Sequence, residues 1–226
     1  MKKHIVVLTG AGISAESGIK TFRDADGLWE GHDVMEVASP EGFAKNPALV
    51  LDFYNQRRRQ LHEVEPNSAH FDLATLEKDY KVTIITQNVD NLHERAGSSK
   101  VIHLHGELLK SRSVADKHTT FEQTGDIVLG DVCPRGFQLR PHIVWFGEDV
   151  PMIETAIDIC GTADILIIIG TSMQVYPAAG LMHYVPDRIP VYYIDKNPAI
   201  QSGDNLTVIA ELATVGMKKI REYLPS

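Results

Sequence analysis

Amide, carboxylate and imidazole side chains gather in two short segments of this chain, and each segment continues from an apolar run. Gln87, Asn88 and Asp90 come after residues 82–85, and His105 closes the stretch 101–105 beside a glycine. Loops at the carboxyl ends of parallel strands are where α/β proteins bind ligands. An imidazole at such a place titrates near neutrality and is suited to act as a general base. The two segments therefore predict a polar ligand site with His105 as its base.

Both segments also have structural interpretations. Asp90 or Asn91 could simply cap a helix that contains His93. His103 and His105 face the same side of an extended segment and could share a metal ion, but no carboxylate or cysteine stands at the spacing that would complete the site. A single histidine next to a strand is more often structural than catalytic.

A glycine turn near the start of the chain predicts a dinucleotide ligand. Gly10, Gly12 and Ala15 fit G-x-G-x-x-[GA] between an apolar run and a helix, the context in which glycines let the backbone approach a diphosphate. An ordinary dehydrogenase would carry an acidic residue at the end of the next strand, but residues 22–27 are typical of a loop. The acid at a strand end is instead Asp195, so we expect the other half of the sheet to recognise the ribose.

The elements that must hold these residues alternate along the chain. Apolar runs with helical stretches between them predict a doubly wound, mostly parallel Rossmann-like α/β sheet. Helices are expected to begin near Asn46, Pro66 and Tyr176, where a capping residue or a proline stands. The predicted strands are residues 5–8, 82–85, 143–146, 165–169, 191–194 and 207–209.

Two polar regions interrupt this alternation. Residues 24–65 are a loop followed by a helix, and residues 107–141 are polar and poor in helix or strand signals. We expect both to form a small inserted lobe over the ligand cleft of a single domain that spans residues 1–226.

Composition excludes several classes of function. The chain has 226 residues, of which 43% are hydrophobic, and a net charge of −8, which opposes binding to nucleic acid. Its longest apolar run is too short to span a membrane, so we expect no membrane partner. We expect the protein to be cytoplasmic. Two cysteines, Cys133 and Cys160, provide no disulfide framework.

Five motifs in a fixed order resemble the sirtuins: GAGISAESGIKTFR, TQNVDNLH, HLHGE, VWFGE and GTS. These are NAD-dependent protein lysine deacylases, and the resemblance, which covers nearly the whole chain, is strongest to the class III bacterial type. It implies that His105 is the general base and that Asn88 and Asp90 take part in catalysis. It also implies that residues 144–148 (Val144, Trp145, Phe146, Gly147 and Glu148) pair with an extended substrate peptide. The positions implied to bind NAD are Gly10, Ala11, Gly12, Ser14, Ala15, Phe22, Arg23, Trp29, Gln87, Asn88, Val89, Asp90, Gly170, Thr171, Ser172, Asp195, Lys196, Asn197 and Ala213.

In the chemistry that the resemblance implies, NAD is consumed as a co-substrate. The amide oxygen of an acyl-lysine attacks C1′ of the nicotinamide ribose as nicotinamide leaves. His105 then deprotonates a ribose hydroxyl, and the products are free lysine and O-acyl-ADP-ribose. Two alternatives remain open: a sensor that binds NAD or ADP-ribose without turnover, and a protein ADP-ribosyltransferase.

Two further features bear on the substrate and on metal. Tyr54 and Arg57 stand three residues apart on one helix face and resemble the class III pair that accepts succinyl, malonyl or glutaryl lysine, with small Ala25 leaving room for the acyl group. The alternative is that residues 57–59 are a solvated basic face. The paired cysteines of the usual zinc module are missing, so we expect no structural zinc; a site of Cys133 with His118 and His142 has irregular spacing.

Overall fold

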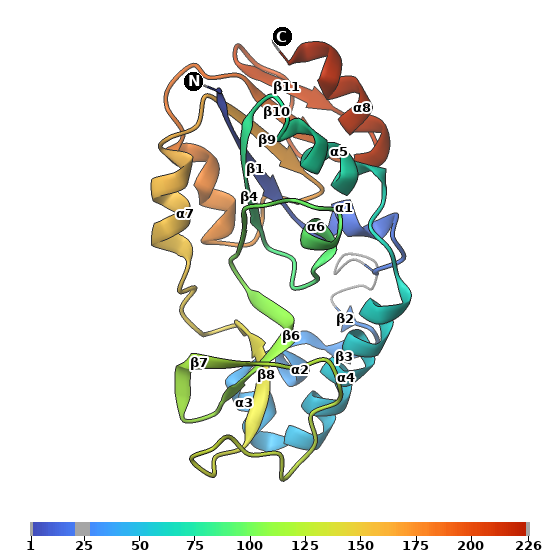
Figure 1. Ribbon diagram of the computed structural model, residues 1–226, viewed down its shortest axis with the longest axis vertical. Coiled ribbons are helices and arrows are strands. Elements are labelled where there is room, and N and C mark those ends of the chain that lie inside the picture. The colour runs from blue at the N-terminus through green and yellow to red at the C-terminus, as the bar shows by residue number, and fades with distance from the viewer. Residues whose placement is uncertain (1, 21–27, 225–226) are drawn as a thin grey trace.

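The structure is a computed structural model that describes residues 2–20 and 28–224. Phe22, Arg23 and Ala25 of the predicted site lie outside the described residues. The chain forms two lobes, a larger one that contains both termini of the described chain and a smaller one built around α4 and an antiparallel sheet (Figure 1).

A six-stranded parallel sheet is the centre of the larger lobe, in the order β11-β10-β9-β1-β4-β5. Its buried strands are almost wholly apolar, as a sheet covered on both faces requires. From β1 the chain first adds β4 and β5 on one side and then β9, β10 and β11 on the other. The position where the strand order changes direction in this way is where α/β sheets bind ligands. The strands are β1 (His4–Thr9), β4 (Lys81–Thr86), β5 (Val101–His103), β9 (Ile165–Ile169), β10 (Val191–Ile194) and β11 (Leu206–Ile209).

Helices cover both faces of this sheet. Ile5 and Val7 of β1 pack in one core with α5 (Ser68–Leu76) and α8 (Ala213–Tyr223). Val6 and Leu8, which point the other way, pack with α7 (Ile153–Cys160) and the 3₁₀ helix η1 (Ala178–Tyr184). Figure 1 shows these two layers on opposite sides of the strands. The predicted doubly wound Rossmann-like fold is therefore confirmed.

The helix starts follow the predicted capping residues. Asn46 accepts a hydrogen bond from the Leu49 amide at the start of α4 (Pro47–Glu63). Asn67 and His70 form a reciprocal capping box at the start of α5. The third expected helix, near Tyr176, is the 3₁₀ helix η1. Among the described residues, no helix is long and apolar enough to cross a membrane.

The smaller lobe corrects two predictions. Residues 107–141, expected to lack strands, hold most of an antiparallel sheet in the order β7-β6-β8. The signal was hidden because the buried positions of β6 include Ser111, Arg112 and Ser113. The predicted parallel strand 143–146 is also wrong, since β8 ends at Ile143 and the following amides bond to a loop and a side chain. The lobe consists of β2 (Leu28–Trp29), β3 (His32–Asp33), α2 (Val34–Val37), α3 (Pro40–Lys45), α4, β6 (Gly106–Ser113), β7 (Asp116–Glu122) and β8 (Leu139–Ile143).

Candidate functional site

The glycine turn lies between β1 and the short helix α1 (Ala11–Ala15), and it packs directly on the end of β9. The Gly12 amide donates to the Gly170 carbonyl at 2.8 Å. A Cβ added at Gly12 would lie 2.5 Å from the Gly170 Cα, and one at Gly10 would lie 2.8 Å from the Gly170 oxygen. Both glycines are thus required for close packing of two loops, in addition to any approach to a diphosphate.

A buried polar cluster joins this turn to the loop after β4. Ser14 Oγ donates to Asp90 Oδ2 at 3.0 Å, and Asn88 Nδ2 lies 3.2 Å from both Ser14 Oγ and the Gly10 carbonyl. Asp90 Oδ1 also accepts from the Leu92 amide at the start of α6 (Leu92–Arg95), so the capping interpretation of Asp90 holds as well. Burial raises the pKa of Asp90 and these hydrogen bonds oppose the rise.

Two histidines on the connection from β5 to β6 have different partners. His105 Nδ1 lies 3.1 Å from the Gln87 carbonyl, which can only accept, so Nδ1 carries the hydrogen and Nε2 keeps a lone pair. Burial lowers the pKa of His105, and the bond to Gln87 opposes this. His103 instead lies between the Asn88 carbonyl at 2.9 Å and the Glu94 carboxylate at 2.8 Å. In its neutral form His105 therefore presents the lone pair of Nε2, and its role as the base stays a prediction.

The ends of β9 and β10 carry the remaining positions that were predicted to bind the nucleotide. Gln87 Nε2 donates to Thr171 Oγ1 at 3.0 Å, and the Tyr193 hydroxyl donates to the Thr171 carbonyl at 2.9 Å. The buried Asp195 carboxylate accepts from the Asn197 amide at 2.8 Å. Of the other predicted NAD positions, Ser172 is half-buried beside Thr171, Lys196 is exposed beside Asp195, and Ala213 starts α8 inside the core.

Tyr54 and Arg57 lie on α4, where they meet the aromatic residues of the smaller lobe. Trp145 Nε1 donates to the buried Tyr54 hydroxyl at 2.9 Å, and Trp29 packs edge-on against Tyr54. The Arg57 guanidinium stacks 3.7 Å above the Phe53 ring, and its Nη1 donates to the Phe53 carbonyl at 2.6 Å. Burial lowers the pKa of Arg57, and nearby Glu30 opposes this.

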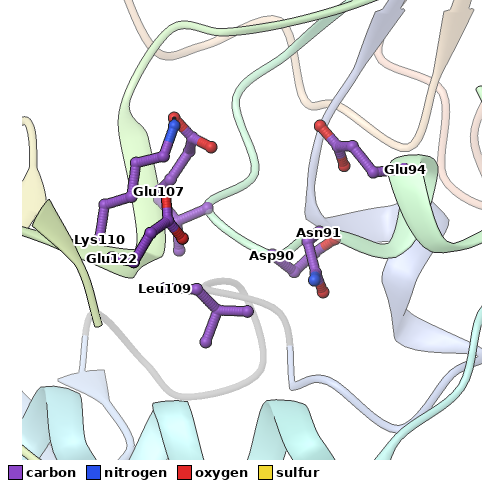
Figure 2. A pocket seen from close by; sticks show the side chains of 8 residues that line it. Asp90, Asn91, Glu94, Glu107, Leu109, Lys110 and Glu122 are labelled. Carbon is purple, nitrogen blue, oxygen red and sulfur yellow. Dashed lines mark hydrogen bonds and ion pairs between the residues drawn. The ribbon is translucent and has the colours of Figure 1, made fainter. Parts of the chain in front are cut away.

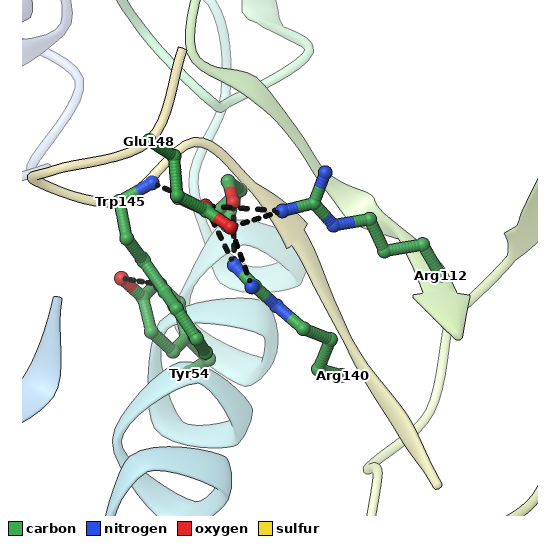
Figure 3. A network of polar contacts seen from close by, with 6 residues as sticks. Tyr54, Arg112, Arg140, Trp145 and Glu148 are labelled. Carbon is green, nitrogen blue, oxygen red and sulfur yellow. Dashed lines mark hydrogen bonds and ion pairs between the residues drawn. The ribbon is translucent and has the colours of Figure 1, made fainter. Parts of the chain in front are cut away.

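Glu148 is held inside the smaller lobe (Figure 3). Its carboxylate accepts from Arg112 Nη2 at 2.8 and 3.0 Å, from Arg140 at 2.9 and 3.1 Å, and from the Trp145 amide at 2.9 Å. Arg140 also stacks 3.2 Å over the Trp145 ring. Burial opposes the charge of Glu148, but the hydrogen bond from Arg140 and the other donors outweigh it and lower its pKa.

Arg112 and Arg140 are functional candidates that the sequence interpretation missed. They connect β6 and β8 to the 144–148 loop through one carboxylate, so they fix the loop that was predicted to bind the peptide. Arg140 could have been found in the sequence, because it stands shortly before the apolar run 143–146 that leads to Glu148. Within that loop the amides of Val144 and Phe146 bond to His105 and Ala38 carbonyls, which leaves strand addition to the remaining backbone groups.

An acidic pocket of about 180 Å³ adjoins Asp90. Figure 2 shows Asp90, Asn91 and Glu94 on one side of it, and Glu107, Lys110 and Glu122 on the other. Val89 and Leu109 supply apolar lining, and Lys110 Nζ bonds to Glu107 at 2.8 Å. Four carboxylates against one ammonium favour a cationic group in this space.

The cysteines lie apart, with Cys160 at the end of α7 in the core of the larger lobe and Cys133 in the smaller lobe. Among the residues that the structure describes, no three His, Cys, Asp or Glu side chains are grouped so that they could hold a metal ion. His118 lies on β7 and His142 on β8.

The site lies where the strand order of a parallel sheet reverses, and it combines a glycine turn, a buried amide and carboxylate cluster and an oriented histidine. These features are typical of a Rossmann-like nucleotide-binding protein. The chain belongs to the Sir2 family, whose sequence model matches residues 10–177, and the resemblance to sirtuins is confirmed. It is 59% identical over 223 residues to an NAD-dependent protein deacylase of Helicobacter pylori, covering 98% of this chain and 97% of the relative. A deacylase of the same description from Bacteroides thetaiotaomicron is 54% identical over 229 residues, with 98% of each chain covered.

Solved structures agree with this assignment. A Sir2 homologue in complex with NAD matches with a TM-score of 0.87 and 38% identity, covering 98% of this chain and 89% of that one. A Sir2 protein bound to an acetylated peptide matches with a TM-score of 0.80 and 28% identity, covering 98% of this chain and 93% of that one.

Proposed function

We propose that this NAD-dependent protein deacylase prefers acidic acyl groups, succinyl and malonyl above all, and retains a weaker deacetylase activity. The observation that carries the proposal is the unoccupied edge of Arg57. Its Nη1 is bonded, but Nε is buried without a partner and Nη2 has no acceptor within hydrogen-bond distance among the described residues. Nε and Nη2 form the edge of a guanidinium that binds a carboxylate with two parallel hydrogen bonds.

Tyr54 supports the same clamp. Its hydroxyl accepts the bond from Trp145 and therefore keeps its own hydrogen, for which the described part of the chain offers no acceptor. Burial raises the pKa of Tyr54, so the phenol stays protonated and can donate. A carboxylate that reaches both side chains would gain three donors in a mostly apolar wall, where charge-assisted bonds are strong.

The residues present suit NAD on the opposite side of the site. The glycine turn leaves no room for a Cβ at Gly10 or Gly12, and Asp195 directly follows β10 in the same sheet. We assign the diphosphate to residues 10–12, the ribose to Asp195 and its neighbours, and the cationic nicotinamide ring to the region of Asn88 and Asp90, next to the acidic pocket. NAD supplies an anomeric carbon with a good leaving group and, after displacement, the ribose that accepts the acyl group.

His105 and its partners then have definite tasks. Gln87 holds the imidazole with Nε2 free, so that Nε2 takes a proton from a ribose hydroxyl and makes the oxygen nucleophilic. Asn88 and Asp90 are connected by hydrogen bonds through Ser14, and they hold the loop beside the nicotinamide ring, which is the leaving group. The 144–148 loop, fixed by Glu148, offers its remaining backbone groups to the peptide. After nicotinamide has left, one water molecule hydrolyses the adduct, so that the C–N bond to lysine breaks and free lysine and O-acyl-ADP-ribose are released.

The test is to incubate the protein with NAD and peptides that carry succinyl-, malonyl- or acetyl-lysine, and to measure nicotinamide release and the deacylated peptide. Absence of nicotinamide release with every peptide would refute the proposal. NAD binding without turnover would indicate a sensor, and label moving from NAD onto protein would indicate ADP-ribosyl transfer.

Arg57→Met should lower kcat/KM for the succinyl peptide by about 10- to 100-fold, since a charge-assisted hydrogen bond is worth about 1.5–3 kcal/mol. Turnover of the acetyl peptide should change by less than threefold. Arg59→Met is the matched control, because Arg59 is an exposed cation on the same helix whose ion pairs are 3.5 and 3.7 Å long. Equal losses with both peptides would reject the clamp.

A further inference from the structure

Glu30 faces the unoccupied edge of Arg57 from the turn between β2 and β3. Trp29 and His32 pair across this hairpin, so Glu30 and Gly31 are its two loop residues. Both have positive φ, 51° and 82°, as a type I′ turn requires. Asn, Asp and Gly adopt that conformation most easily, whereas Glu is strained in it. A strained residue that carries a carboxylate at this position suggests that the carboxylate has a task.

The contacts of Glu30 divide its charge between two cations. Oε2 accepts from Lys20 Nζ at 3.1 Å and lies 3.8 Å from Arg57 Nη2. The second distance is close enough for an ion pair but too long for a hydrogen bond. Arg57 has only 15% of its side chain exposed and Glu30 only 20%, so the attraction between them is weakly screened. Glu30 is therefore a counterion of Arg57, while Nε and Nη2 have no acceptor within hydrogen-bond distance in residues 2–20 and 28–224.

We propose that Glu30 is a specificity-determining residue that holds the place of the acyl carboxylate beside Arg57. This inference rests on the proposed preference for acidic acyl groups. When a succinyl or malonyl group binds Nε and Nη2, Glu30 keeps its bond to Lys20, and the repulsion between the two carboxylates lowers the affinity. When an acetyl group binds, Glu30 stays as the counterion, so no buried cation is left unpaired. Glu30 thus widens the acyl range at the expense of affinity for acidic acyl groups.

Removing the charge tests the proposal. Glu30→Gln should lower KM for the succinyl peptide by about two- to fivefold, the effect of a partly exposed ion pair, at unchanged kcat and unchanged KM for NAD. KM for the acetyl peptide should stay within twofold. Glu41→Gln makes the same charge change on an exposed residue of α3 that has no contact with Arg57 and should alter none of these values.

Two further variants make the interpretation specific. Lys20→Met leaves Glu30 to Arg57 alone, so it should raise KM for the succinyl peptide, the opposite sign. In an Arg57→Met background, Glu30→Gln should no longer change KM for the succinyl peptide, because Arg57 no longer holds the acyl carboxylate beside Glu30.

The outcomes distinguish the proposed function from the role of Glu30. A wild-type protein that does not prefer the acidic peptide contradicts the proposed function itself. A protein that prefers it through Arg57, but in which Glu30→Gln changes succinyl and acetyl KM equally, changes neither, or alters KM for NAD, overturns the role of Glu30 alone.

Discussion

His103 and His105 stand two residues apart, yet their surroundings shift their pKa values in opposite directions. Burial opposes a charge on both. For His103 the bond and ion pair with Glu94 outweigh burial and raise the pKa, whereas at His105 the bond to the Gln87 carbonyl does not outweigh burial and the pKa is lowered. The sequence offers two equivalent imidazoles, and only the partners from distant segments identify which one can accept a proton.

The pH dependence of turnover should follow His105. Because we assign the base to its neutral form and its pKa is lowered from 6.5, kcat/KM should rise with pH along an acid limb whose midpoint lies below pH 6.5. His105→Ala should lower kcat by about 10²- to 10⁴-fold and remove this acid limb. His183→Gln, a change at an exposed histidine on η1, should leave both unaltered. A limb centred above pH 6.5, or one that persists in His105→Ala, would assign the base to another group.

The sequence predicts the parts of the site that follow from strand ends, and it does not predict partners that come from distant segments. Ser14, Asn88 and Asp90 meet because strands β1 and β4 end at one edge of the sheet, and strand ends follow from apolar runs. Glu148 could not be placed in this way. Its carboxylate faces two arginines that come from antiparallel strands, and no local pattern indicates which neighbours a carboxylate will face.

At the scale of elements, the larger lobe follows from the sequence and the smaller lobe does not. Continuous apolar runs mark β1, β4, β9, β10 and β11. In β6 the buried positions include Arg112, whose guanidinium bonds to Glu148, and Ser113, whose hydroxyl accepts from the Ala115 amide. A sequence pattern predicts a loop for such a strand, because it shows the polar residues but not the side chains that pair with them in the fold.

The capping box of α5 predicts a sensitivity to acid. His70 Nδ1 accepts from the Asn67 amide, and burial lowers the pKa of His70 to about 4; His93, which is also held neutral by burial, packs against it with ring centroids 4.9 Å apart. The unfolded chain binds a proton near pH 6.5 that the folded state excludes. The free energy of unfolding should therefore fall as pH drops from 6.5 toward 4, by up to about 1.4 kcal/mol per pH unit from His70.

His70→Gln is the informative variant, because glutamine at this position of a capping box can bond to the same amide without titrating. Urea denaturation at pH 7 and pH 5 should show a smaller loss of stability in this variant than in the wild type. His183→Gln should behave as the wild type does. An unchanged difference between the two pH values in His70→Gln would show that His70 does not cause the acid sensitivity.

At the scale of the whole molecule, the candidate site lies where the chain passes between the two lobes. His105 follows β5 of the parallel sheet, and Gly106 begins β6 of the antiparallel sheet. Gly106 has φ of 83°, and a Cβ there would collide with the His142 carbonyl, so this crossing requires glycine. The base is thus fixed between a lobe that we assign to NAD and a lobe that we assign to the acyl-lysine.

The smaller lobe is held together by side chains of α4. The Asn55 amide bonds to both backbone groups of Ile127, at 2.9 Å each, in the manner of a neighbouring strand. Buried Arg58 donates to the Leu108 carbonyl at 3.0 Å and to Asn55 Oδ1 at 2.7 Å. These bonds connect α4 to the 124–128 loop and to β6, within the region 107–141 where the sirtuin resemblance would place a zinc module.

We therefore expect the folded state to depend on Asn55 and to be independent of metal. Metal analysis of the purified protein should find far less than one zinc ion per chain, and a chelator should leave both Tm and deacylation unchanged. Asn55→Ala should reduce the free energy of unfolding by about 2–4 kcal/mol, because two backbone groups and the Arg58 guanidinium lose a buried partner. Gln56→Ala, which removes an exposed amide one residue along α4 that bonds to Asp52 at 2.7 Å, should cost less than about 1 kcal/mol. Stoichiometric zinc, or a Tm that falls on chelation, would mean that a metal ion rather than α4 closes this lobe.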